Sequence, residues 1–169
     1  FTNSDQEAEY LRSIAVHGKG SYKYDNIRIG WNSRLDTIQA AVLLVKFKAF
    51  QAYELEAVNK VASWYTEALV DTVKTPVVPE GCYSSWAQYT IQLGDENQRT
   101  EIQKKLKEQG IPTMVYYPKP MHEQTAFDGL KQYVQCPVTE RLCKTVVSLP
   151  LDGYKKKKEC MAISEVATN

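Results

Sequence analysis

The chain has 169 residues, and its 21 lysines and arginines nearly balance 20 acidic residues, which leaves a net charge of +1. So small a net charge gives no electrostatic reason to expect binding to nucleic acid or to a membrane surface. No stretch approaches the ~18 consecutive apolar residues of a membrane span, and we expect no signal peptide. The length is enough for one domain with a substantial core.

Residues 4–16 predict a short helix, with Ser4 as the N-cap and Glu7 at the capping-box position. The polar, glycine-containing residues 17–33 predict an irregular loop. From about residue 34 to residue 70, an apolar stripe at helical spacing predicts a long helix, which would span ~55 Å if straight. Because that length is too great for one small domain, we expect a bend or break near residues 50–53.

The start of this long helix carries polar residues suited to anions. Ser33 and Asp36 stand three apart and form a variant capping box. A helix N-terminus with unpaired N–H groups and a positive dipole end attracts phosphate or carboxylate. Asn32 and Arg34 would add an amide and a guanidinium there. A simple cap beside a solvated arginine explains the same residues, and both interpretations stay open.

The first half of the long helix is apolar almost all round, from Ala40 to Val45. A helix of this kind is normally covered on more than one side. A second subunit, or polypeptide beyond this chain, would supply that cover.

The second half of the chain predicts an α+β fold, a small and mainly antiparallel sheet with helices on one face. Alternating or β-branched runs predict its strands, and helical periodicity with a stop at Gly110 predicts its helices. The expected strands are residues 86–93, 111–117 and 146–149, and the expected helices begin at Asn97 or Thr100, at Thr139 and at Lys155.

Four cysteines show neither a C-x-x-C pair nor a metal-ligand spacing with the two distant histidines. We therefore expect reduced thiols and no metal site, as in a cytoplasmic protein. The cysteines are Cys82, Cys136, Cys143 and Cys160.

Five stretches, taken in order, resemble the DegT/DnrJ/EryC1/StrS family of pyridoxal-phosphate-dependent sugar aminotransferases. The resemblance covers the chain from Phe1 to about Tyr154. The stretches are FTNSDQEAEYLRSIAVHGKGSYKYDNIRIG, GWNSRLDTIQAAVLLVKF, SSWAQYTIQL, GIPTMVYYPKPMHEQTAF and CPVTERLCKTVVSLPL.

The resemblance implies the C-terminal portion of a fold-type I enzyme. Residues 1–33 would form the end of the cofactor-domain region and an active-site loop, residues 34–71 a long interdomain helix, and residues 72–169 the small C-terminal domain. The lysine that forms the Schiff base with the cofactor would lie outside this chain. None of the lysines present is therefore expected to be catalytic, and the isolated chain is expected to be inactive.

The resemblance also implies site residues. Asn32 corresponds to an asparagine that reaches the pyridoxal 5'-phosphate (PLP) phosphate of the partner subunit, and Arg34 to a residue that contacts an anionic part of the substrate. Tyr116, Tyr117 and His122 fall in a substrate-side loop. From the residues alone, a structural role is the simpler explanation: a cap for Asn32, a surface cation for Arg34, a packed strand end for the tyrosines and a turn residue for His122.

The whole enzyme would be a homodimer with shared active sites that moves an amino group from glutamate to a nucleotide-linked keto-sugar, for surface polysaccharide or amino-sugar biosynthesis. The stretch NSRLDTIQAA favours members that act on UDP-linked 3-keto hexuronates. Tyr22, Lys23 and Tyr24 would lie in a loop near the partner's site. Two alternatives stay open: a PLP-dependent sugar dehydratase without the lysine, and a non-catalytic regulatory or binding module of the same fold.

Overall fold

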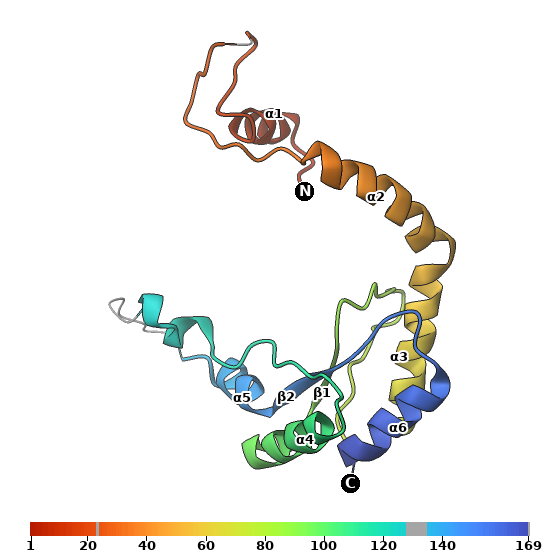
Figure 1. Cartoon of the computed structure of the whole chain (residues 1–169). Helices are drawn as coiled ribbons and strands as arrows, with labels where there is room; N and C mark the ends of the chain where they lie inside the picture. Colours follow the sequence, from red (N-terminus) through yellow and green to blue (C-terminus); the bar gives the residue numbers. More distant parts are fainter. Residues whose placement is uncertain (23, 128–134, 169) are drawn as a thin grey trace. The chain divides into compact units, whose positions relative to one another are not determined.

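The computed structural model describes residues 1–22, 24–127 and 135–168 (Figure 1). It forms two compact units, Phe1–Ala49 and Phe50–Asn169. The three-part division expected from the sequence concerns the whole enzyme and stays a prediction. Among the described helices, none is both long and apolar enough to cross a bilayer.

Unit 1 begins with the expected helix. Helix α1 (Asp5–Ile14) starts where the side chain of Ser4 accepts a hydrogen bond from the N–H of Glu7, with 3.3 Å between the two heavy atoms. The following residues form a loop whose two arms pair through isolated antiparallel bridges, Val16 with Asn32 and Lys19 with Asn26. This pairing makes the loop more ordered than its polar composition indicated.

Helix α2 (Thr37–Ala49) begins later than the expected residue 34. Its cap is Asp36, whose Oδ1 accepts from the N–H groups of Ile38 and Gln39 at 2.9 and 3.2 Å. Ser33, the expected cap, instead donates its N–H to the carbonyl of Ala15 at 2.9 Å. The capping-box prediction was therefore wrong, because the loop pairing occupies Ser33 and Asp36 is itself a strong cap.

A π-helical segment, Phe50–Glu54, follows α2 and leads into helix α3 (Leu55–Leu69). It lies where the sequence predicted a break. The phenol of Tyr154 donates to Glu54 Oε1 at 2.5 Å, which ties the segment to a loop far along the chain. The π-helical segment is thus held by a hydrogen bond from another part of unit 2.

Unit 2 is built on two antiparallel strands, β1 (Tyr89–Gln92) and β2 (Val146–Leu149), in the register Tyr89 to Leu149. Isolated bridges extend the pair on both sides, Lys74 with Gln92 and Met114 with Ser148. The α+β class with a small antiparallel sheet is confirmed. The remaining elements are α4 (Glu96–Glu108), α5 (Pro137–Thr145), α6 (Lys157–Thr168) and the 3₁₀ turns Met121–Glu123 and Thr125–Phe127.

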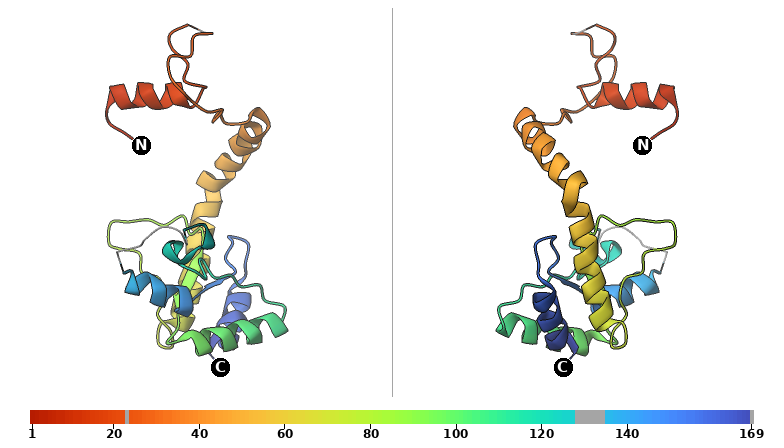
Figure 2. Two further views of the ribbon diagram at one scale, coloured as in Figure 1. Left: turned by 90° about the vertical axis from the view of Figure 1, so that its left-hand side faces the viewer. Right: turned by 90° about the vertical axis from the view of Figure 1, so that its right-hand side faces the viewer.

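One face of the two strands contributes to the core. Alternate residues of β1 and β2 are buried there together with side chains of α3, α4 and α6. Helices α3 and α6 pack side by side in both views of Figure 2. The fully buried side chains with the largest volumes are Tyr65, Tyr89, Leu69, Ile91 and Leu106.

The strand expected over residues 111–117 was wrong, since only Met114 makes a bridge there. Pro112 and Pro118 lack the N–H that a ladder requires, which explains why pairing does not extend. The cap of α4 is Asp95 rather than Asn97 or Thr100, because Asp95 Oδ1 accepts from the N–H of Gln98 at 2.9 Å.

Candidate functional site

The first group of candidate residues lies on the loop of unit 1, which three backbone hydrogen bonds fix. The N–H of His17 donates to the carbonyl of Trp31 at 2.9 Å, and the N–H of Trp31 donates to the carbonyl of Ile14 at 2.7 Å. The third is the bond from the N–H of Ser33 to the carbonyl of Ala15, at 2.9 Å. Asn32 is therefore held between two paired residues rather than on a free loop.

Gly30 makes this close pairing possible. A Cβ atom at Gly30 would lie 2.1 Å from the backbone nitrogen of Gly18 and 2.6 Å from the carbonyl oxygen of Ile14. Such separations are far below van der Waals contact, so only glycine fits there. Gly18 is equally restricted, with φ of +74° and the carbonyl oxygen of Arg28 only 1.7 Å from a built Cβ.

The structure brings Asn32 and Arg34 together. Arg34 Nε donates to Asn32 Oδ1 at 3.1 Å, and both residues are exposed. This bond orients the amide so that its NH₂ group is the donor left for a ligand, and the guanidinium keeps its terminal N–H groups. Two adjacent donors of this kind fit an oxyanion such as a phosphate or a carboxylate.

At the start of α2, Asp36 occupies the N–H groups of Ile38 and Gln39 and brings its own negative charge to the positive end of the helix dipole. The simple cap is thus formed by Asp36, and an anion at this helix start stays a prediction. The capacity to bind an anion rests on the side chains of Asn32 and Arg34.

Tyr22 and Tyr24 lie in the same loop, with ring centroids 6.2 Å apart in an edge-to-face arrangement. Both side chains are exposed. Lys23, which the resemblance placed between them, lies outside the described residues. Arg28 lies over the ring of Tyr10, with Cζ 5.0 Å from its centroid, and is a cation that the sequence reading had not singled out.

The second group of candidates lies in unit 2. Tyr116 and Tyr117 have ring centroids 5.9 Å apart at an interplanar angle of 80°. Both line a pocket of about 380 Å³ on the side of β1 that carries Thr90. The other lining residues are Lys119, Pro120, Met121, Gln124, Thr139, Leu142, Cys143 and Val146. Apolar walls with a few polar groups are typical of a small-molecule pocket.

His122 does not line this pocket. Its Nε2 lies 3.2 Å from Glu140 Oε1 and 3.9 Å from Glu123 Oε1. Glu140 Oε1 also accepts from the N–H of Cys136 at 3.3 Å. Because a hydrogen bond that joins the 3₁₀ turn to the start of α5 accounts for the contact with Glu140, His122 has a structural role here and the substrate contact stays a prediction.

Sequence reasoning missed Lys119 and Glu140. Lys119 lies between two prolines in the stretch YYPKPMH, which fixes it beside the tyrosine pair, and it is a cation at the pocket wall. Glu140 lies in the first turn of α5, where an acidic residue is expected to stabilise the helix N-terminus. Nothing in the sequence therefore indicated its contact with His122.

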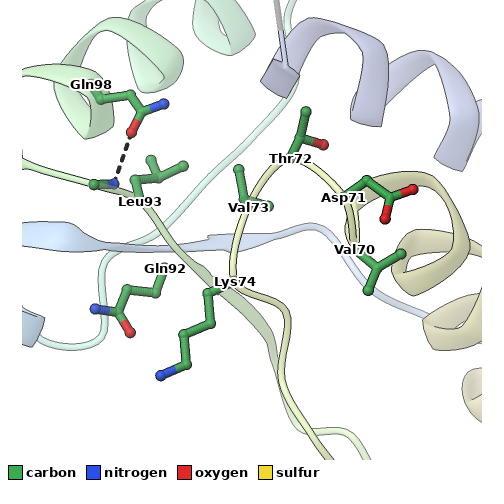
Figure 3. A pocket seen from close by; sticks show the side chains of 9 residues that line it. Val70, Asp71, Thr72, Val73, Lys74, Gln92, Leu93 and Gln98 are labelled. Carbon is green, nitrogen blue, oxygen red and sulfur yellow. Dashed lines mark hydrogen bonds between the residues drawn. The ribbon is translucent and has the colours of Figure 1, made fainter.

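A further pocket of about 380 Å³ lies at the C-terminal end of α3 (Figure 3). Gln98 Oε1 accepts from the N–H of Gly94 at 2.8 Å, and Lys74 and Gln92 lie at the opposite end. Lys74 and Gln92 exchange backbone hydrogen bonds at 3.2 and 2.9 Å. The polar groups of this pocket thus form hydrogen bonds that hold the edge of the sheet and the start of α4. None of the predicted site residues lines it.

Comparison with known proteins identifies similar sequences along the whole chain. The profile of the DegT/DnrJ/EryC1/StrS aminotransferase family matches residues 1–165. The UDP-2-acetamido-2-deoxy-3-oxo-D-glucuronate aminotransferase of Pseudomonas aeruginosa is 38% identical and is matched over 100% of this chain and 45% of its own length. A pleiotropic regulatory protein of Geobacillus stearothermophilus is 41% identical over 98% of this chain and 44% of its own.

A solved structure agrees with these relatives. The crystal structure of a DegT DnrJ EryC1 StrS aminotransferase from Brucella abortus superposes with a TM-score of 0.88 at 45% identity, over 99% of this chain and 44% of that one. The present chain therefore spans slightly less than half the length of the relatives that it matches.

Proposed function

The chain belongs to the DegT/DnrJ/EryC1/StrS aminotransferase family, and from this we propose that its whole protein transfers an amino group from glutamate to a keto-sugar linked to a nucleotide. The observation that carries the proposal is the 38% identity, along the entire chain, to an aminotransferase of Pseudomonas aeruginosa whose named substrate is a UDP-linked 3-oxo-glucuronate. That relative also supports a UDP-linked 3-keto hexuronate as the substrate.

The cofactor of this reaction would be PLP, which carries the amino group between donor and acceptor. The donors found in unit 1 fit its phosphate, because Arg34 turns the NH₂ group of Asn32 outward. We assign Asn32 to the cofactor phosphate of a partner subunit. The Arg34 guanidinium would then serve the anionic part of the substrate.

The pocket of unit 2 would hold the sugar. Tyr116 and Tyr117 offer two phenols and two ring faces, and Lys119 offers a positive charge for a carboxylate or diphosphate. His122 would contribute indirectly by fixing the turn that follows Lys119. The whole protein would be a homodimer with shared active sites, located in the cytoplasm, where its thiols stay reduced.

The test is an absorption spectrum of the complete protein, recorded before and after addition of glutamate. A visible band of bound PLP that bleaches with glutamate supports the transferase. The variant Asn32→Ala should retain PLP less well, whereas Asn26→Ala is the matched control, since Asn26 is also an asparagine in a bridge of the same loop. Unchanged PLP affinity in Asn32→Ala would remove the assigned role.

A second candidate function is regulation without catalysis, which the 41% identity to a pleiotropic regulatory protein favours. A complete protein that binds no PLP would support this reading. Binding of PLP without bleaching would instead move the lysine-free dehydratase ahead of the transferase.

A further inference from the structure

Three side chains of unit 2 that carry metal-binding atoms point toward one another. One ligand atom from each of His122, Glu123 and Glu140 lies within 4.8 Å of the other two. His122 and Glu123 belong to the 3₁₀ turn Met121–Glu123, whereas Glu140 belongs to the first turn of α5. Two segments of the chain thus bring a nitrogen and two oxygens to one point.

The separations of these atoms suit the coordination of a single ion. Zn²⁺ binds imidazole nitrogen and carboxylate oxygen at about 2.0–2.2 Å, which places neighbouring ligands of a tetrahedral site about 3.3 Å apart. Nε2 of His122 lies 3.2 Å from Glu140 Oε1 and 3.9 Å from Glu123 Oε1. A small rotation of the half-exposed Glu123 side chain brings its oxygen to the same distance.

The kinds of donor atom select the class of ion. Mg²⁺ and Ca²⁺ prefer oxygen ligands alone, whereas an imidazole together with carboxylates suits Zn²⁺ and similar ions. Three protein ligands leave a coordination position for water, as in open zinc sites. The expectation of no metal site rested on the cysteines and on the distance between the two histidines, and did not cover a set with one histidine.

The negative charge of the cluster exceeds what its histidine can balance. Among the residues that the structure describes, the ion-pair partner of both carboxylates is His122, and neither pairs with a lysine or an arginine. One imidazole, even when it is protonated, carries one positive charge against two negative charges. A divalent cation would supply the missing charge where the two carboxylates approach each other.

The cluster also joins two walls of the pocket that Tyr116 and Tyr117 line. Residues next to the three ligands in the chain line that pocket, and they come from both segments. They are Met121 and Gln124 beside the turn, and Thr139 and Leu142 around Glu140. An ion held by both segments would therefore fix these two walls relative to each other.

We propose that His122, Glu123 and Glu140 bind a divalent metal ion of the zinc class. In the metal-free protein, the hydrogen bond between His122 Nε2 and Glu140 Oε1 holds two of the ligands together. The N–H of Cys136 donates to Glu140 Oε1 at 3.3 Å and further restrains this carboxylate. The ion takes no part in the transfer of the amino group, so the inference goes beyond the proposed function and does not depend on it.

Calorimetric titration of the complete protein with ZnCl₂, in a buffer that does not bind metals, tests the site. His122→Gln keeps an N–H donor for Glu140 but removes the metal-binding nitrogen. Glu140→Gln keeps the size of the side chain but removes its charge. Each variant should weaken zinc binding by at least about 10-fold, since even partners that only orient a metal ligand contribute that much.

Two control variants separate this site from adventitious binding of zinc. His17→Gln removes the other histidine of the chain, which lies in unit 1. Cys136→Ser removes a thiol next to the bond that restrains Glu140. Both variants should keep the zinc affinity of the native protein.

Hydrogen exchange gives a second measurement, at amides that are bonded in the two segments. Zinc should slow exchange at Gln124 and Cys136 in the native protein and leave it unchanged in His122→Gln. Equal zinc affinity of the native protein and His122→Gln would overturn the proposal, as would absence of zinc binding or its loss in Cys136→Ser. Because none of these measurements involves PLP or glutamate, the zinc site and the transferase can fail independently.

Discussion

At the scale of single residues, Gly30 determines whether the loop can form the backbone pairing that positions Asn32. Gly30→Ala would force the Cβ atom against the backbone of Gly18 and Ile14. We expect local destabilisation of the loop by about 2 kcal/mol, in the range of overpacked sites. Native-state hydrogen exchange at the amides of Trp31 and Ser33 should show the loss.

Gly94→Ala is the control for this prediction. Its Cβ would meet only Gln98 Oε1, at 3.2 Å, which is the end of a flexible side chain. Exchange in the loop of unit 1 should not change in that variant. Unaltered loop protection in Gly30→Ala would show that the backbone pairing can relax around the added atom.

Prediction from the residues succeeded where one short signal decided the local structure, and it failed where two signals competed. Ser4 and Glu7 met no competitor, and Ser4 caps α1 as predicted. Ser33 and Asp36 both match the cap pattern, but Ser33 belongs to a pairing with Ala15 that no local rule reveals. Asn32 and Arg34 were selected as binding residues, which stays a prediction, and the hydrogen bond between them was not foreseen.

Tyr65 predicts how the stability of unit 2 depends on alkaline pH. Burial raises the pKa of its phenol above the ordinary 10.0, and the hydroxyl donates to the carbonyl of Pro150 at 2.9 Å. Because the folded pKa is the higher one, this stabilisation is complete below about pH 10 and is lost as the pH rises above that value toward the folded pKa.

Urea unfolding between pH 8 and pH 11 checks this expectation. The decline should be shallower in Tyr65→Phe than in the native chain, although burial of Tyr89 raises its pKa as well and leaves part of the decline. Tyr83→Phe alters an exposed ring and should keep the native slope. An identical slope in Tyr65→Phe would contradict the assignment.

At the scale of elements, one side chain of α3 holds the segment that leads into β1. Asn59 Nδ2 donates to the carbonyl of Ser84 at 2.9 Å, and Asn59 Oδ1 accepts from the indole N–H of Trp86 at 2.8 Å. Trp86 has a φ of +49°, which a bulky residue rarely adopts. The hydrogen bonds of Asn59 thus offset an unfavourable backbone conformation.

Asn59→Ala should destabilise unit 2 by about 2 kcal/mol, because a part-buried carbonyl and an indole N–H lose their partner. Chemical denaturation followed by circular dichroism measures the change. Ser63→Ala removes an exposed hydroxyl of the same helix that bonds only the local carbonyl of Lys60, and should cost less than about 0.5 kcal/mol. Equal effects of the two variants would refute the role of Asn59.

Two expected strands differ in outcome although both are short: residues 146–149 form β2, whereas residues 111–117 do not form a strand. The length of the helical pattern led to the expectation of a bend or break near residues 50–53, and the π-helical segment Phe50–Glu54 lies there. Residues 111–117 alternate as a strand does, yet only Met114 pairs. Its prolines were visible in the sequence, but the neighbour that a strand would pair with was not, and tertiary pairing decides strand formation.

At the scale of the whole molecule, the two units differ in how they are held together. The buried apolar side chains of the described residues all belong to unit 2. In unit 1 the described buried positions are Ser13 and Gly18, and backbone hydrogen bonds maintain the loop. Hydrogen bonds exposed to water contribute little net stability without an apolar core.

We therefore expect unit 1 to open locally while unit 2 stays folded. In the dilute chain, the amides of His17 and Trp31 should exchange about 100-fold faster, or more, than those of Ile91 and Val147. Protection of unit 1 equal to that of the core in dilute solution would show that hydrogen bonding alone stabilises it.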